Sequence, residues 1–248
     1  MLNKIIRKNN RLLAGFYKAG CSYRSLNYPV ISFTFDDCMH NAIETGASIL
    51  NYYDVKGTFY VSGALTNKYE NNLKCHTYND VVSLVNDSHE IASHLFNHRK
   101  CEELTLSELK DEVKKSKEYI FDLYGQSKEL NFSYPFGSVD LKTKKYLYSE
   151  FTSARNIVTG VNKKKFDRLS LNAFPLYLSK CTEKQILRAI KEASINDYWL
   201  IFYTHDVSKN PSQYGITPDL LKFAVRSSME NNCKIQTIEQ VLTNCELG

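Results

Sequence analysis

The sequence lacks the features of a disulfide-stapled or membrane-spanning protein. Its seven cysteines are odd in number and scattered, and no two form a Cys-x-x-Cys pair, so a disulfide framework is not expected. No run of about 18 apolar residues occurs, which leaves no candidate for a transmembrane helix. Residues 1–28 include basic side chains but no apolar run of signal-peptide length. These absences predict a cytoplasmic protein without a secretion step.

Internal repeats and low-complexity tracts are absent as well. The chain has 248 residues, of which 43% are hydrophobic and 24% charged. That is enough for one domain with a sizeable core and too little for two comfortable ones. We therefore expect a single folded domain over residues 30–248, preceded by an N-terminal extension, residues 1–29.

The net charge of +5 resides mainly in the lysine-rich segments 142–145 and 163–165. Aromatic residues are not interleaved with these lysines at the spacing of nucleic-acid-binding surfaces, so no nucleic-acid partner is expected. We interpret these lysine-rich segments as solvated helix faces and loops. A basic rim would still favour the approach of an anionic, phosphate-linked small molecule.

The N-terminal extension has the pattern of an amphipathic helix over residues 1–20. Its apolar residues are Leu2, Ile5, Ile6, Leu12, Leu13 and Phe16, and its basic residues are Lys4, Arg7, Lys8 and Lys18. Packing of this helix on the main domain is the favoured interpretation. Peripheral contact with a membrane surface is the alternative.

Strand-like and helix-like segments alternate along the chain, which predicts a parallel sheet with crossover helices. The predicted strands are Val30–Phe35, Gly57–Val61, Glu90–Ser93, Asn131–Tyr134, Phe151–Ala154 and Trp199–Thr204. The predicted helices are Asn41–Tyr53, Tyr78–Asn86, Leu106–Tyr124, Leu141–Ser149, Glu183–Ala193 and Pro218–Glu230. Two helix starts carry capping-box patterns, Thr105 with Glu108 and Thr182 with Gln185.

Two adjacent carboxylates, Asp36 and Asp37, follow directly on a buried strand. Ionised carboxylates away from water need a cation or a shared proton. Downstream, His94 and His98 are four residues apart, and their imidazoles share one face if that turn is helical. Asp37, His94 and His98 together would form a two-histidine, one-carboxylate metal site with open positions. Asp36 would then be free to act as a base.

Further candidate residues follow the other predicted strands. The turn Pro135–Gly137 comes after one strand, Arg155 after the next, and His205 after the apolar strand that ends at Thr204. The carboxyl ends of parallel strands converge on one rim of a barrel, and sites are built there. Residues far apart in the sequence are therefore expected to meet.

The ordered set of motifs resembles the polysaccharide deacetylase family, the NodB-like enzymes of carbohydrate esterase family 4, over about residues 30 to 240. The resemblance implies a distorted, incomplete (β/α) barrel of about seven parallel strands, with residues 30–248 as the catalytic domain. It also implies one divalent metal ion; zinc is the default for nitrogen and oxygen ligands, and cobalt, iron, manganese or nickel are the alternatives.

Roles for individual residues follow from the same resemblance. Asp36 would be the general base and His205 the general acid that protonates the departing amine. The backbone N–H of Phe136 would stabilise the oxyanion. Tyr134, Phe136, Phe202 and Tyr203, with Pro135 in the turn between them, are expected to form the substrate-binding wall.

Three positions depart from the family pattern. Leu95 stands where the family usually has a hydroxyl residue after the first metal histidine, and Tyr203 replaces a usual leucine beside the catalytic histidine. Ser133 stands where the third motif usually begins with arginine, so Asp36 lacks its expected cationic partner. Arg155, at the next strand end, is the candidate replacement.

The expected activity is removal of an N-acetyl group from a sugar. The predicted cytoplasmic location favours a lipid- or nucleotide-linked precursor of a surface polysaccharide as the substrate, with membrane association through residues 1–20 as a further expectation. A deformylase, an O-deacetylase and a catalytically silent carbohydrate-binding barrel are the alternatives. The residues leave open the sugar, the acyl group, the metal and the oligomeric state.

Overall fold

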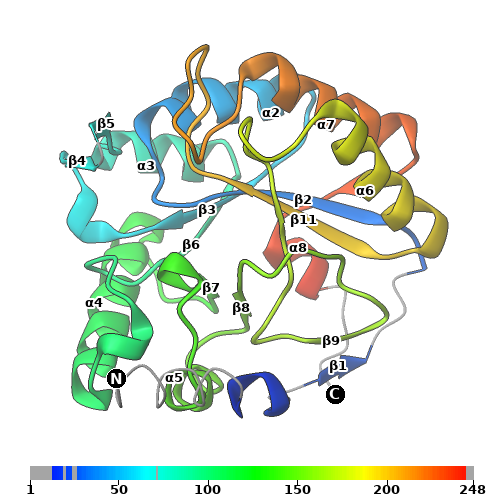
Figure 1. Cartoon of the computed structure of the whole chain (residues 1–248). Coiled ribbons are helices and arrows are strands. Elements are labelled where there is room, and N and C mark those ends of the chain that lie inside the picture. Colours follow the sequence, from blue (N-terminus) through cyan, green and yellow to red (C-terminus); the bar gives the residue numbers. More distant parts are fainter. Residues whose placement is uncertain (1–12, 19–20, 24–26, 71, 244–248) are drawn as a thin grey trace.

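The computed structural model of the chain describes residues 13–18, 21–23, 27–70 and 72–243. Its centre is a curved parallel sheet of seven strands in the order β10-β11-β2-β3-β6-β7-β8 (Figure 1). The strands are β2 (Val30–Phe35), β3 (Thr58–Val61), β6 (Glu90–Ser93), β7 (Asn131–Ser133), β8 (Ser153–Arg155), β10 (Phe174–Pro175) and β11 (Trp199–Thr204). The predicted incomplete, distorted barrel is confirmed.

Two short antiparallel pairs and one extra strand complete the sheets. The pairs are β1 (Cys21–Tyr23) with β9 (Lys165–Asp167), and β4 (Tyr69–Glu70) with β5 (Leu73–Lys74). The extra strand β12 (Lys234–Ile235) pairs with the first two residues of β2. Because β3 pairs only with the last two residues of β2, β12 satisfies the backbone groups that this late pairing leaves free.

Helices connect the strands, and all but the last of them, α8, pack against the outer face of the sheet. They are a π-helical turn (Ala42–Ala47) that continues into α2 (Ser48–Tyr52), then α3 (Tyr78–Asn86), α4 (Leu106–Tyr124), α5 (Leu141–Leu147), α6 (Glu183–Asn196), α7 (Pro218–Glu230) and α8 (Ile238–Thr243). Helices α2, α6 and α7 lie along one side of β2 and β11, and α8 lies on the other side (Figure 1). No helix in the described ranges has the length and apolar character needed to cross a bilayer.

Side chains alternate between two cores along each strand. On β2, Ile31, Phe33 and Phe35 face the outer helices, whereas Val30 packs in the concave interior with Trp199 and α8. Side chains at even-numbered positions of β2 therefore point into the half-barrel, and Asp36 continues this series at the strand's carboxyl end.

Most predicted elements are observed with small shifts at their ends. The strands β2, β6 and β11 and the helices α3, α4 and α7 have the predicted bounds. The strand predicted at Phe151–Ala154 instead runs from Ser153 to Arg155, and α6 continues to Asn196. Both predicted capping boxes are confirmed, and Thr77 with Asp80 forms a third that the prediction missed.

One lysine contradicts the expectation of solvated basic segments. Lys144 is 1% exposed; its ammonium pairs with Asp167 and donates to the carbonyls of Ala14 (3.0 Å) and Tyr17 (2.7 Å). A buried ammonium needs such partners. Lys144 thereby fastens residues 13–17 of the extension to α5 and β9. Residues 1–12, the first part of the predicted amphipathic helix, lie outside the described residues, and the division at residue 29 stays a prediction.

Cys38, Cys75, Cys101, Cys181 and Cys233 are buried free thiols.

Candidate metal centre and active site

Asp36 and Asp37 leave the end of β2 in different directions. Asp36 continues the hydrogen bonding of β2 to β11, because its N–H donates to the carbonyl of Thr204 at 2.9 Å. Asp37 turns sharply, with φ at 61°, a left-handed conformation that aspartate tolerates better than most residues. The turn carries the second carboxylate across the rim toward the histidines.

His94 and His98 lie on an irregular loop after β6, so the helical turn assumed for their spacing is wrong. Leu95 (φ 59°) and His98 (φ 52°) both have left-handed backbone conformations, which interrupt any helix. Glu112 of α4 clamps the loop, accepting hydrogen bonds at 2.8 Å from both the backbone and the side-chain N–H of Asn97. This clamp steadies the loop without a hydroxyl at position 95.

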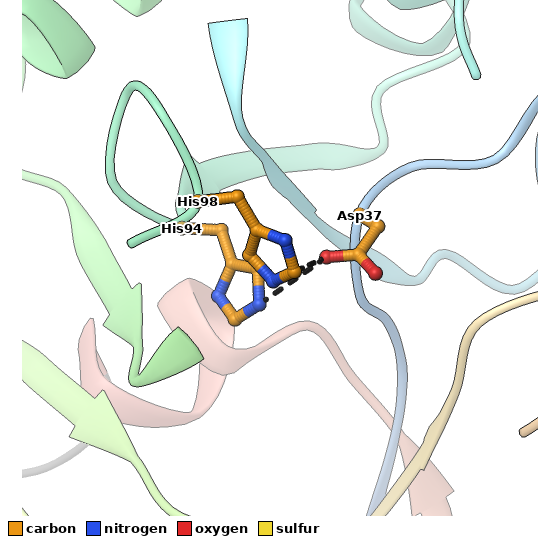
Figure 2. Close-up of side chains that lie close together, drawn as sticks. All are labelled: Asp37, His94 and His98. Atoms are coloured by element: carbon orange, nitrogen blue, oxygen red, sulfur yellow. Dashed lines mark ion pairs between the residues drawn. The ribbon is translucent and has the colours of Figure 1, made fainter. Parts of the chain in front are cut away.

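The three candidate ligands converge on one point. Asp37, His94 and His98 each offer a ligand atom, and these atoms lie within 4.8 Å of one another (Figure 2). Asp37 Oδ1 is 3.0 Å from His98 Nε2 and 3.5 Å from His94 Nε2. Among the described residues Asp37 Oδ1 has no hydrogen-bond donor although it is buried. A divalent cation between these atoms would satisfy all three.

Outer partners fix the ring orientation of both histidines. His94 Nδ1 donates to the carbonyl of Ser133 at 2.8 Å, and His98 Nδ1 lies 3.1 Å from Glu70 Oε1. Each contact leaves Nε2 facing Asp37. Burial lowers the pKa of His94 to about 3, so this imidazole is neutral, which is the form that binds a metal.

The pKa of Asp37 is raised, chiefly by burial. Positive charge on His98 and His205 would lower the pKa of Asp37, but this effect is smaller than that of burial. A bound cation would restore the ionised form, so the donor set and the burial both fit a divalent metal.

Arg155 lies against Asp36, fully buried. Its Nη2 is 2.5 and 2.6 Å from the two oxygens of Asp36 and also donates to Ser133 Oγ. Burial opposes ionisation of Asp36, but the charges of Arg155, His94 and His205 together lower its pKa below the usual value. Asp36 is therefore ionised at neutral pH.

The register of the sheet explains how Arg155 reaches this position. Ser133 on β7 pairs directly with Arg155 on β8, so the two side chains point to the same face. A serine at position 133 leaves the room that the guanidinium occupies. The cation expected on one strand is thus present on its neighbour at the same height.

His205 follows β11, the direct neighbour of β2 in the sheet. Its Nε2 is 3.8 Å from Asp37 Oδ2, and its ring packs against Tyr177 and Tyr214, with centroids 5.8 and 5.4 Å away. Its Nδ1 is buried and has no hydrogen-bond partner within the described part of the chain. His205 is therefore oriented by ring packing rather than by a carboxylate.

Asp206, the next residue, holds the loop that carries Tyr214. Its carboxylate accepts hydrogen bonds from the N–H (3.0 Å) and the hydroxyl (2.5 Å) of Ser212. A Cβ at position 215 would lie 2.3 Å from that carboxylate, so Gly215 permits the close approach.

A cleft of about 760 Å³ opens above the candidate metal ligands, within the usual ~300–1,000 Å³ range of small-molecule sites. Tyr134, Phe136 and Tyr203 line it as predicted, and so do the unpredicted Tyr177 and Lys180. The Phe136 ring is 55% exposed and stacks on His98 at 4.5 Å. An exposed aromatic face beside the ligands suits the apolar face of a sugar ring.

Two residues predicted for the wall belong elsewhere. Phe202 is buried in the outer core, stacked with Phe33 at 5.5 Å, because side chains alternate along β11 and its neighbour Tyr203 takes the inner face. Pro135 does not line the cleft; it shapes the turn that presents Phe136. Gly137 completes that turn at φ 63°, where a Cβ would meet Ile157 at 2.3 Å.

The sequence reasoning missed Glu70, Tyr177 and Tyr214. Glu70 lies on the β4–β5 hairpin. Polar and apolar residues alternate in the sequence on both sides of the pair Asn71 and Asn72, and this pattern is the signal that would have predicted the hairpin. Tyr177 and Tyr214 reach His205 from irregular segments, and neither carries a motif of its own.

Comparison with known proteins agrees with this geometry. The sequence profile of the polysaccharide deacetylase family matches residues 24–150. No curated protein sequence matches the chain significantly.

Solved structures with this fold are distant in sequence. A family 4 acetyl xylan esterase from Clostridium thermocellum, in complex with a cobalt ion, is 18% identical, with 87% of this chain and 91% of that chain covered and a TM-score of 0.61. A peptidoglycan N-acetylglucosamine deacetylase is 15% identical, with 88% and 90% covered and a TM-score of 0.62. A mutant of a CE4 family pseudoenzyme with restored activity is 16% identical, with 87% and 68% covered and a TM-score of 0.58.

These structures share the fold, and the profile covers half of the sequence, from before β2 to the end of the α5 region. The same half contains the three candidate metal ligands. The chain belongs to the polysaccharide deacetylase family.

Proposed function

We propose that this protein is a metal-dependent hydrolase that removes the N-acetyl group from a sugar. The observation that carries the proposal is the convergence of Asp37, His94 and His98 beside an ionised Asp36 at the floor of one cleft. Two of the proteins with similar structures, the acetyl xylan esterase and the peptidoglycan N-acetylglucosamine deacetylase, are named for their action on acetylated carbohydrates. This similarity supports an acetylated sugar as the substrate.

The ligand set is Asp37 Oδ1 with the Nε2 atoms of His94 and His98. A divalent metal ion held there would polarise the acyl oxygen and make water a stronger nucleophile at neutral pH. Zinc is the metal we propose from the nitrogen and oxygen donors, and cobalt, iron, manganese and nickel suit the same donors.

Asp36 would take the proton from the attacking water. The positive charge of Arg155 stabilises the ionised form of Asp36. The Asp36 side chain lines the cleft beside the ligands. Arg155 in turn is held by Ser133 and by the carbonyl of Asn156 at 3.0 Å. The guanidinium thus orients the base and prevents it from occupying the ligand position of Asp37.

His205 would donate a proton from Nε2 to the departing amine. Its Nε2 is 3.8 Å from the carboxylate of Asp37, and both His205 and Asp36 line the cleft, so a scissile bond above the ligands would be within reach of the base and the acid. The backbone N–H of Phe136 would stabilise the oxyanion, and Tyr203 with Tyr177 would enclose the acyl methyl group.

Basic side chains at the mouth of the cleft support a phosphate-linked substrate. Lys180 lines the cleft, and Lys100 Nζ lies 5.4 Å from the centroid of the exposed Phe136 ring. Ammonium groups beside an aromatic platform would attract a lipid- or nucleotide-linked sugar. A cytoplasmic biosynthetic precursor is therefore the substrate that we propose, and the cytoplasmic location itself stays a prediction.

The proposal is tested by the products of hydrolysis. The metal-loaded full chain is incubated with a panel of acetamido sugars that are free, nucleotide-linked or lipid-linked, and acetate and formate are measured separately. Acetate release from a phosphate-linked member, abolished in Asp36→Asn, is the expected result. Release of formate alone would contradict N-deacetylation, and no release from any member would contradict the hydrolase assignment.

A further inference from the structure

His98 is held from a part of the chain that carries no family motif. The β4–β5 hairpin projects from the segment between β3 and α3 and is closed by backbone hydrogen bonds from Asn67 N–H to the His76 carbonyl (2.8 Å) and from Cys75 N–H to the Lys68 carbonyl (2.9 Å). Its residue Glu70 reaches His98, 28 positions along the chain. The hairpin also lines the cleft, through Glu70 and Leu73.

The geometry separates this contact from the ligand position. Glu70 Oε1 is 3.1 Å from His98 Nδ1, whereas Asp37 Oδ1 is 3.0 Å from Nε2 on the opposite side of the same ring. An imidazole whose Nδ1–H donates to a carboxylate keeps its Nε2 lone pair free, and the negative charge raises the electron density on that nitrogen. Glu70 is therefore placed behind the ligand rather than among the ligands.

The two histidines differ in this outer contact. His94 donates to a neutral backbone carbonyl of Ser133, and only His98 donates to a charged group. His98 also has a left-handed backbone, with φ at 52°, and its ring is stacked on the half-exposed Phe136. The orientation of the His98 ring therefore depends on a side-chain carboxylate from the hairpin, whereas that of the His94 ring depends on the main chain of β7.

We propose that Glu70 is a positioning residue for the metal ligand His98 and that metal binding is thereby coupled to the stability of the β4–β5 hairpin. The proposal rests on the metal site of the proposed function. Outer-sphere partners of metal-bound histidines typically change metal affinity by about 10- to 100-fold. The reverse also holds: a metal that fixes His98 stabilises every group bonded to it, including the hairpin wall of the cleft.

Metal affinity tests the first half of the proposal. The dissociation constants of zinc and cobalt are measured on the full chain by competition with a chromophoric chelator. We expect about 10- to 100-fold weaker binding in Glu70→Ala and a smaller loss in Glu70→Gln, which keeps an acceptor without the charge. Lys74→Gln, an exposed substitution on the same hairpin, is the matched control and should bind as the wild type does.

Hydrogen exchange tests the second half. In the wild type, adding zinc should slow exchange of the Asn67 and Cys75 amides, which close the hairpin. In Glu70→Gln and Glu70→Ala the slowing should be reduced, while exchange in the central strands of the sheet should match that of the wild type in the metal-free state. This last comparison separates loss of the contact from a failure to fold.

The outcomes distinguish this proposal from the proposed function. Affinity within twofold of the wild type in Glu70→Ala, or hairpin exchange that does not respond to metal, would overturn the positioning role alone. Complete loss of binding in Glu70→Gln, equal to that in His94→Ala, would overturn it in favour of a direct ligand. Equal metal content in the His94→Ala variant and the wild type would overturn the metal site itself.

Discussion

The carboxylates of Asp36 and Asp37 are neighbours in sequence with opposite electrostatic surroundings. Asp36 meets a guanidinium and has a lowered pKa, whereas Asp37 is buried without a guanidinium and has a raised one, which the histidines only partly offset. The left-handed turn at Asp37 creates this difference by aiming the two side chains at different strands. One residue is thus prepared to act as a base and the other to gain from a cation.

Removal of Arg155 should therefore impair both stability and turnover. In Arg155→Met we expect the free energy of unfolding to fall by about 3–5 kcal/mol, because Asp36 becomes an unpaired buried charge. The pKa of Asp36 should rise without the guanidinium beside it, lowering kcat/KM at neutral pH. Urea unfolding and steady-state kinetics measure the two effects.

The double variant Arg155→Met with Asp36→Asn is the control for stability. It removes both charges and should recover most of the lost unfolding free energy while staying inactive. A second comparison, Ser133→Arg with Arg155→Ser, moves the cation back to the neighbouring strand and should restore part of the turnover. Turnover in Arg155→Met equal to that of the wild type would show that the guanidinium has no part in orienting the base.

The acid role of His205 predicts a dependence on the leaving group. In His205→Asn, hydrolysis of an amide should slow by about 10²- to 10⁴-fold, because the amine departs unprotonated. An activated aryl ester, whose leaving group hardly needs a proton, should slow much less. Both rates are measured on metal-loaded protein. Equal slowing of the two substrates, or loss of the metal, would assign His205 to another role.

At the scale of elements, His89 ties the start of β3 to the start of β6. Its Nδ1 accepts a hydrogen bond from Gly57 N–H at 3.0 Å, and its ring packs edge-on to Phe59 at 5.3 Å. Burial, together with the charge of Lys56, lowers the pKa of His89 to about 4. The imidazole is therefore neutral in the folded protein and would have to be protonated against that environment in acid.

This histidine predicts acid sensitivity with a defined sign. The unfolded chain takes up the proton near pH 6.5 and the folded chain only near pH 4, so the contribution of His89 is present above about pH 6.5 and is lost as the pH falls toward 4. Between pH 7 and pH 5 the loss should be about 2 kcal/mol. Urea unfolding at both pH values, with a chelator present, should show a smaller loss in His89→Asn. The same loss in both proteins would refute this assignment.

A helix or strand could be predicted from the sequence where its own residues determine it, and not where it depends on contacts with distant segments. The strands β2, β6 and β11 are buried over their whole length, and α3 and α4 carry their own caps, so local sequence patterns were enough to predict their bounds. The strand β10 has two residues, one of them Pro175, and exists because Phe202 and Tyr203 pair with it. No local pattern encodes such a strand.

At the scale of the whole molecule, the half-barrel gathers groups from eight separate stretches of the chain into one cleft. The sequence predicted that Asp36, Asp37, His94, Pro135, Arg155 and His205 would meet, because each falls at or just after the end of a predicted strand, and His98 was added by its spacing from His94. It did not predict the groups that orient them. Glu70 and Tyr177 reach the site from a hairpin and a loop, so their roles depend on tertiary contacts alone.

The central claim is that Asp37, His94 and His98 hold one divalent metal ion while Asp36 and His205 serve the chemistry beside it. The most direct test is the metal content of zinc-loaded, desalted protein, determined by elemental analysis for the wild type, His94→Ala, Asp37→Ala and Asp36→Asn. The account predicts about one equivalent per chain in the wild type and in Asp36→Asn, and loss of it in His94→Ala and Asp37→Ala. Equal metal content in all four proteins would contradict it.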